Sequence, residues 1–128
     1  MISLIVDTSV WVEFFRGRPL PDLEVALREG LVVLPPVVAA ELLSAPLSPS
    51  RRAQLRSFLL DLPLHPTPFG HWERLGALRS QLSRQGVTVS TPDAHIAQCA
   101  LETEGRIWSL DAIFGKIAAK LPLRLFAP

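Results

Sequence analysis

Four short, mostly apolar segments, separated by longer stretches of helical periodicity, constrain the fold of this chain more than any other feature. The segments lie at residues 2–6, 31–34, 106–110 and 123–126, and short apolar segments of this kind are typical of strands buried on both faces. Strands that alternate with helices form a parallel sheet with helices on both sides. We therefore predict an α/β fold, a three-layer α/β/α sandwich with a central parallel sheet, in one domain spanning residues 1–128.

Caps, prolines and glycines predict where the helices begin and end. Thr8 or Ser9 is expected to cap the first helix, Asp22 the second, and Thr91 a helix whose first residue is Pro92. The predicted helices end near residues 15, 29, 43, 60, 84, 103 and 120, and the helix over 69–84 is the longest. Residues 64–65 are a candidate for a further short strand.

Composition is typical of a folded protein rather than a disordered or membrane-spanning one. Of the 128 residues, 48% are apolar, enough to bury a core. No apolar run reaches the roughly 20 residues that span a membrane, and the start lacks the features of a signal peptide, so we expect a cytoplasmic protein. The formal net charge of +1 is no sign of nucleic-acid binding, so any attraction to RNA must depend on how the charges are arranged.

Four acidic residues occupy positions that a folded core does not require. Asp7 and Asp111 directly follow two predicted strands, at the carboxyl edge where parallel sheets place their sites. Asp93 falls in the first turn of its helix, where the helix dipole favours an anion. Glu41 lies in an apolar stretch, where an ionised carboxylate is costly unless it is paired or binds a cation.

Each of these acids alone has an ordinary explanation as a turn residue, a helix start or an ion-pair partner. Together at one edge of the sheet, they would repel one another, and some would take up protons unless a cation lay among them. Oxygen ligands without a suitable set of histidines and cysteines select Mg²⁺ or Mn²⁺ over zinc. The sequence therefore predicts a site for one of these cations.

Four segments contain these acids: residues 5–11 (IVDTSVW), 37–42 (VVAAEL), 91–97 (TPDAHIA) and 108–114 (WSLDAIF). In this order and at this spacing, they resemble the motifs of the PIN-domain nucleases, in particular the VapC-like toxins of bacterial and archaeal toxin–antitoxin pairs. One segment alone would say little, whereas all four in a chain of this length are specific. The resemblance covers essentially the whole chain.

The resemblance implies a metal-dependent endoribonuclease that hydrolyses RNA phosphodiester bonds with one or two Mg²⁺ or Mn²⁺ ions. It implies that the catalytic, metal-binding residues are Asp7, Glu41, Asp93 and Asp111. Asp7 and Asp93 would be direct ligands, while Glu41 and Asp111 would bind directly or through water, or would position the attacking water. Ser9 would support Asp7 by hydrogen bonding, although a plain N-cap role fits Ser9 as well, and the same two roles are open for Thr91.

A toxin would also have an antitoxin that covers the site and a tendency to form a homodimer. Apolar residues on the early predicted helices are candidates for the antitoxin groove, with packing in the core as the alternative. These residues are Val12, Phe14, Phe15, Leu23 and Leu27.

Basic residues are candidates for contacts with RNA phosphates, which a ribonuclease needs around its site. Arg79 and Arg84 come first, because they precede Gly86 and the next predicted helix, and Arg16 and Arg18 come after them. A solvated helix face is the alternative for all of them.

The histidines and the single cysteine are not expected to bind metal. His95 follows Asp93 by two residues, so on a helix it should point away from that acid, toward the rim or the solvent. His65 and His71 lack the spacing of metal ligands, and Cys99 should pack as a small hydrophobic residue.

Other functions are open on the sequence alone. A response-regulator phosphoacceptor needs an acidic pair at the end of its first strand, and one class of phosphohydrolase needs a second aspartate two residues after the first; Thr8 and Ser9 follow Asp7 instead. A PIN-fold RNA-processing nuclease outside a toxin–antitoxin pair, or a non-catalytic metal- or RNA-binding module, would share the fold. The complete set of four acids argues against the module, and the short length favours the toxin.

Overall fold

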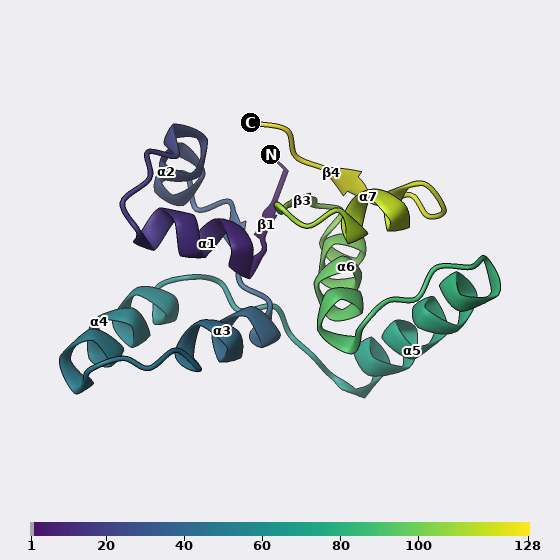
Figure 1. The fold of residues 1–128 in the computed structure, drawn as a ribbon, viewed down its shortest axis with the longest axis horizontal. Coiled ribbons are helices and arrows are strands. Elements are labelled where there is room, and N and C mark those ends of the chain that lie inside the picture. Colours follow the sequence, from purple (N-terminus) through teal and green to yellow (C-terminus); the bar gives the residue numbers. More distant parts are fainter. Residues whose placement is uncertain (1) are drawn as a thin grey trace.

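Four short strands pair in parallel to form the centre of the molecule (Figure 1). The structure, a computed structural model, describes residues 2–128. In it, the sheet has the order β2-β1-β3-β4, and Val6 in β1 lies opposite Trp108 in β3. The predicted parallel sheet is confirmed, with strands shorter than expected. The strands are β1 (Leu4–Val6), β2 (Val32–Val33), β3 (Arg106–Trp108) and β4 (Arg124–Leu125).

Seven helices connect these strands within the described residues, and local sequence explains most of their starts. Proline stands in the first turn of four helices, where its missing N–H costs nothing. The hydroxyls of Ser48 and Ser90 accept the N–H groups of Arg51 and Asp93, each at 3.2 Å. The helices are α1 (Thr8–Phe15), α2 (Pro21–Arg28), α3 (Pro36–Leu43), α4 (Pro49–Leu60), α5 (Phe69–Arg84), α6 (Thr91–Thr103) and α7 (Ile113–Ala118).

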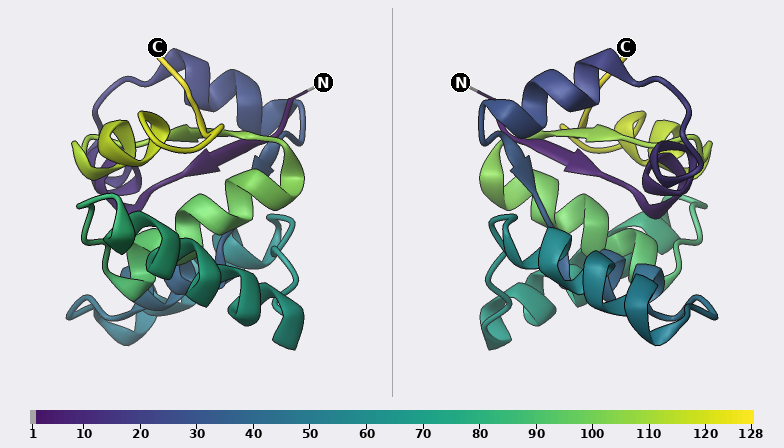
Figure 2. Two further views of the ribbon diagram at one scale, coloured as in Figure 1. Left: turned by 90° about the vertical axis from the view of Figure 1, so that its right-hand side faces the viewer. Right: turned by 90° about the vertical axis from the view of Figure 1, so that its left-hand side faces the viewer.

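Helices cover the sheet on both faces, which confirms the three-layer prediction. α6 packs against β1 and β3, and α5 packs on the outer side of α6. Figure 2 shows α2 on the opposite side of the sheet from α6. None of the helices between residues 2 and 128 is both long and apolar enough to cross a membrane.

Three predicted helix starts were wrong by one or two residues. The N-cap of α1 is Asp7, which makes no side-chain cap bond because its carboxylate accepts two serine hydroxyls instead. The N-cap of α2 is Leu20, since Pro21 already adopts the first helical position, ahead of Asp22. Ser90 caps α6, so Thr91 lies inside the first turn rather than at the cap.

One strand end was also wrong, with consequences for the site. β3 ends at Trp108, whereas the sequence predicted a strand that continues to Leu110. The hydroxyl of Ser109 accepts the N–H of Asp111 at 2.9 Å, and such a local side-chain bond competes with the sheet. Asp111 therefore lies in a turn beyond the strand. The expected short strand near residue 64 is a single parallel bridge between Leu34 and Leu64.

Packing of α5 against the core predicts a large stability loss on truncation of Leu82, which is 0% exposed. We expect Leu82→Ala to lower the free energy of unfolding by about 2–5 kcal/mol, because it leaves a cavity. The control is Leu60→Ala, since Leu60 is 65% exposed and should change stability by less than about 0.5 kcal/mol. Urea unfolding measures both. Equal losses would contradict this packing.

Candidate functional site

The site is built at the carboxyl edge of the two central strands. β1 has β2 on one side and β3 on the other, so connections diverge here, the position at which open parallel sheets bind ligands. Asp7 follows β1 directly, and its N–H donates to the carbonyl of Trp108 at 2.9 Å. This backbone bond holds Asp7 at the edge, where it is 7% exposed.

Two serine hydroxyls fix the carboxylate of Asp7. Ser9 donates to Oδ2 at 2.9 Å, and Ser109 donates to the same oxygen at 2.7 Å. The N–H of Leu110 in turn donates to the hydroxyl of Ser9 at 3.1 Å. Because both hydroxyls use Oδ2, no hydrogen bond from residues 2–128 reaches Oδ1, and this oxygen is available to a ligand.

The hydrogen bond expected from Ser9 is therefore present, but the role of Ser109 was not predicted. Ser109 lies next to Asp7 because Val6 and Trp108 are opposite each other in the sheet. Correct placement of the end of β3 would have identified it, since Ser109 is the first residue after that strand.

Glu41 enters the site from α3. Its Oε1 accepts the hydroxyl of Thr8 at 2.9 Å, which connects α3 to the residue that follows Asp7. The sequence argument that apolar surroundings make this carboxylate costly was wrong, because the Glu41 side chain is exposed.

Asp93 and Asp111 bring the remaining negative charge. Burial raises the pKa of Asp93; a hydrogen bond with Ser90 opposes this effect, and repulsion from Asp111 and Asp7 adds to it. The three aspartates are thus close enough to influence one another. Asp111 also accepts the N–H of Ile113 through Oδ1 at 3.0 Å, which fixes its side chain near the start of α7.

These acids fit a hydrated hard cation better than a closely coordinated one. In residues 2–128, no three of their carboxylates bring ligand atoms within 4.8 Å of one another. Mg²⁺ typically keeps several waters and binds one or two carboxylates directly. Such an ion would bind the free Oδ1 of Asp7. Its positive charge would also favour the ionised form of Asp93, whose pKa is raised without it.

Of three predicted peripheral residues, one is exposed and the other two make contacts elsewhere. Thr91 is exposed in the first turn of α6 and does not cap it. Arg79 donates from Nε to the carbonyl of Val89 at 2.8 Å, which anchors the loop before α6. Arg84 donates to the hydroxyl of Ser80 at 3.2 Å on the exposed face of α5. The structure does not connect these side chains to the acids.

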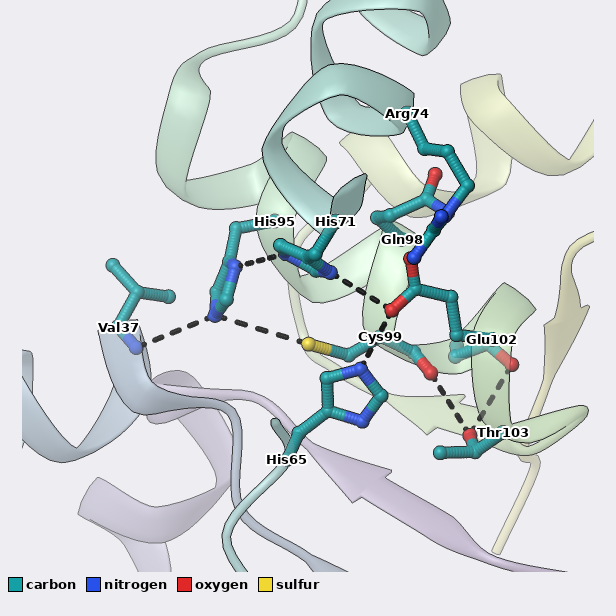
Figure 3. Close-up of polar contacts among 10 residues, drawn as sticks. Val37, His65, His71, Arg74, His95, Gln98, Cys99, Glu102 and Thr103 are labelled. Atoms are coloured by element: carbon teal, nitrogen blue, oxygen red, sulfur yellow. Dashed lines mark hydrogen bonds and ion pairs between the residues drawn. The ribbon is translucent and has the colours of Figure 1, made fainter. Parts of the chain in front are cut away.

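A second polar cluster, which the sequence did not predict, is mostly buried and is shown in Figure 3. We call His65, His71, Arg74, His95, Gln98 and Glu102 the histidine network. His95 was expected at the rim or in solvent but is 1% exposed, because α6 turns it toward α5 and α3. The detectable signal was the helical spacing of His95, Gln98 and Glu102, which puts three polar side chains on one face of α6.

Glu102 is the acceptor at one end of this network. Its Oε1 accepts Nε2 of His65 and Nδ1 of His71, both at 2.8 Å, and its Oε2 accepts Arg74 at 2.8 Å and Gln98 at 3.0 Å. Burial alone would raise the pKa of Glu102, but these four donors hold it well below its ordinary range. His71 also contacts His95, with Nε2 and Nδ1 at 2.8 Å.

Comparison with known proteins identifies the chain's relatives. A model of the PIN domain family matches residues 4–120. No curated protein matches the chain by sequence. The structure is similar to VapBC2 from Rickettsia felis bound to a promoter DNA fragment, with a TM-score of 0.79, 20% identity and 98% of each chain covered.

Two further solved structures have the same fold. DNA-bound VapBC from Salmonella typhimurium has a TM-score of 0.75 and 19% identity, with 98% of each chain covered. FitAcB from Neisseria gonorrhoeae has a TM-score of 0.67 and 20% identity, with 97% of this chain and 96% of that chain covered. At these identities, the likeness shows the fold alone.

The raised pKa of Asp93 predicts a pH-dependent stability in the absence of metal. A carboxyl whose pKa is higher in the folded state than its ordinary 3.8 gives stability at low pH that is lost as the pH rises through the folded value. In EDTA at neutral pH, we expect Asp93→Asn to unfold at a higher temperature than the wild type, with a difference that shrinks on acidification toward pH 3.8.

Thermal unfolding followed by circular dichroism measures this difference. The control is Glu73→Gln, which removes a charge from an exposed position on α5 and should not show this pH dependence. A lower unfolding temperature for Asp93→Asn at neutral pH would contradict the destabilisation of the ionised Asp93 by burial and by the neighbouring Asp111 and Asp7.

Proposed function

Because the chain belongs to the PIN domain family, whose members are generally nucleases, we propose that it is a metal-dependent endoribonuclease and the toxin of a toxin–antitoxin pair. The observation that carries the proposal is the arrangement of Asp7. Both of its hydroxyl donors bind Oδ2, which leaves Oδ1 free. The carboxylates of Asp7 and Asp111 are also near enough to Asp93 to repel its negative charge. A carboxylate group fixed in this way is suited to hold a cation.

The residues have separate roles in this proposal. Ser9 and Ser109 orient Asp7, and Thr8 orients Glu41. Asp7 and Asp93 would hold Mg²⁺ or Mn²⁺ directly, while Glu41 and Asp111 would act directly or through water. One or two such ions, when bound, would activate a water and neutralise charge on an RNA phosphodiester.

Loss of cleavage on removal of one acid is the first test. Loss of an outer-shell partner of a metal costs up to about 100-fold in activity, and loss of a direct ligand should cost more. We therefore expect Asp93→Asn to lower cleavage of mixed RNA, tRNA included, by more than about 100-fold. EDTA should abolish cleavage by the wild type. The control is Asp22→Asn, the same chemical change at an exposed position on α2.

Cleavage that survives EDTA or Asp93→Asn would contradict the proposal. If no tested RNA is cut, calorimetric titration with Mn²⁺ decides. Binding that Asp93→Asn abolishes supports the site, and the absence of binding to the wild type contradicts it.

An apolar groove supports an antitoxin as partner. The groove, of about 540 Å³, lies between α1 and the α3–α4 pair, and Phe15 stacks on Trp11 beside it. The similar structures from Rickettsia felis and Salmonella typhimurium are complexes of VapB with VapC by name. The groove is lined by Val12, Phe15, Arg16, Leu42, Ala45, Leu47, Arg51, Gln54, Leu55 and Phe58.

Of the five apolar residues predicted for the antitoxin groove, two line it. Val12 and Phe15 line the groove, whereas Leu23 is 0% exposed in the core and Leu27 and Phe14 pack against that core. Arg16 and Arg51 line it as well, so an apolar segment with nearby acidic residues would fit it. The proposal also includes a homodimer, in which a second copy of the chain is a further partner.

Truncation of Phe15 tests the groove. Phe15 is 45% exposed, so Phe15→Ala should leave the fold intact while it weakens binding of the protein encoded by the adjacent gene. We expect a loss of at least about 10-fold, because aromatic side chains dominate such interfaces. The control is Leu64→Ala, which is 60% exposed outside the groove. Equal affinities of the two variants would contradict this role.

A further inference from the structure

One backbone donor determines where the protons lie in the histidine network. The N–H of Val37 is 3.5 Å from Nε2 of His95, and because an N–H group only donates, Nε2 must accept. A ring whose Nε2 accepts in this way is neutral, so His95 carries its one ring proton on Nδ1. That proton is donated to Nε2 of His71 at 2.8 Å.

The same logic continues through His71 to Glu102. With Nε2 as an acceptor, His71 carries its proton on Nδ1 and donates it to Oε1 of Glu102 at 2.8 Å. The result is a directional chain from Val37 through His95 and His71 to Glu102. It joins α3, α6 and α5 in one set of hydrogen bonds.

The neighbouring thiol agrees with this arrangement. The sulfur of Cys99 is 3.8 Å from Nε2 of His95, and burial raises the pKa of the thiol to about 12, so Cys99 is a second, weak donor to that nitrogen. Although His65, His71 and Cys99 bring ligand atoms within 4.8 Å of one another, hydrogen bonds already engage the histidine nitrogens that face Glu102. Both ring nitrogens of His71 are hydrogen-bonded, so a metal bound there would have to displace Glu102 or His95.

The contact with Val37 replaces a missing helix cap. α3 starts at Pro36 after the N-cap Pro35, which offers no side-chain hydrogen bond. The N–H of Val37 is one of the first-turn groups that lack a partner within a helix. His95, from α6, accepts it instead, so the start of α3 is held by α6.

This link joins the two helices that carry acids of the site. Val37 precedes Glu41 by one helical turn on α3, and His95 follows Asp93 within the first turns of α6. We propose that the histidine network positions α6 against α3 and so sets the spacing of Asp93 and Glu41. This inference rests on the proposed metal site, and in it Glu102 is a positioning residue that acts through His71 and His95.

The proton positions are the first test, on the wild-type protein. Free neutral imidazole favours a proton on Nε2, whereas the network requires Nδ1–H on both His71 and His95. NMR of protein labelled with ¹⁵N in histidine distinguishes the two tautomers. Nδ1–H on both rings supports the network, and Nε2–H on His95 overturns it whether or not the protein cleaves RNA.

A charge-matched pair of variants is the second test. Glu102→Gln should lower the affinity for Mn²⁺ about 10-fold, the effect of an outer-shell partner, and should shift the amide resonances of Val37 and Asp93. Glu104→Gln removes the same charge from an exposed position just after α6 and should change neither. Affinities are measured well below the unfolding temperature, so a loss of stability alone would not move them.

The outcomes separate this inference from the proposed function. If the wild type binds Mn²⁺ and the two variants bind it equally, the positioning role of Glu102 is wrong. If the wild type binds no Mn²⁺, the proposed function fails, and the amide shifts alone decide. Shifts at Val37 and Asp93 in Glu102→Gln only would still support positioning, and equal shifts in both variants would overturn it.

Discussion

The parallel pairing of β1 with β3 is the interaction on which the site depends. Val6 lies opposite Trp108, and one further backbone bond joins Asp7 to the carbonyl of Trp108. This register puts the first residue after β1 beside the first residue after β3, so the hydroxyl of Ser109 reaches the carboxylate of Asp7. A shift of one residue would turn every side chain of β3 to the other face of the sheet and remove that contact.

α6 is the second determinant, because it carries both an acid of the site and half of the histidine network. Asp93 lies in its first turn, and His95, Gln98 and Glu102 follow along one face toward α5 and α3. Polar groups are costly in a protein interior unless they are paired, and here the carboxylate of Glu102 has four donors. The helix therefore tolerates a polar face that also fixes its position.

Sequence patterns predicted the features that depend on local chemistry and on apolar runs. The parallel sheet, the layers and the bounds of α5 were correct, since strand hydrophobicity and helix periodicity carry this information. The end of β3, the role of Ser109 and the burial of His95 were not predicted. Each of them depends on a partner distant in sequence, such as Asp7 for Ser109, which local patterns do not contain. Glu41 was placed in apolar surroundings because its neighbours in sequence are apolar, yet its side chain is exposed.

We propose above that the acids at the carboxyl edge of the sheet hold a divalent cation. The most direct test is a crystal structure of the protein grown with Mn²⁺, with the ion located by its anomalous scattering. We expect an ion bound to Oδ1 of Asp7 and to Asp93, with Oδ2 of Asp7 still accepting the hydroxyls of Ser9 and Ser109. A peak only elsewhere, such as between His65 and His71, or no peak at the acids at saturating Mn²⁺, would contradict it.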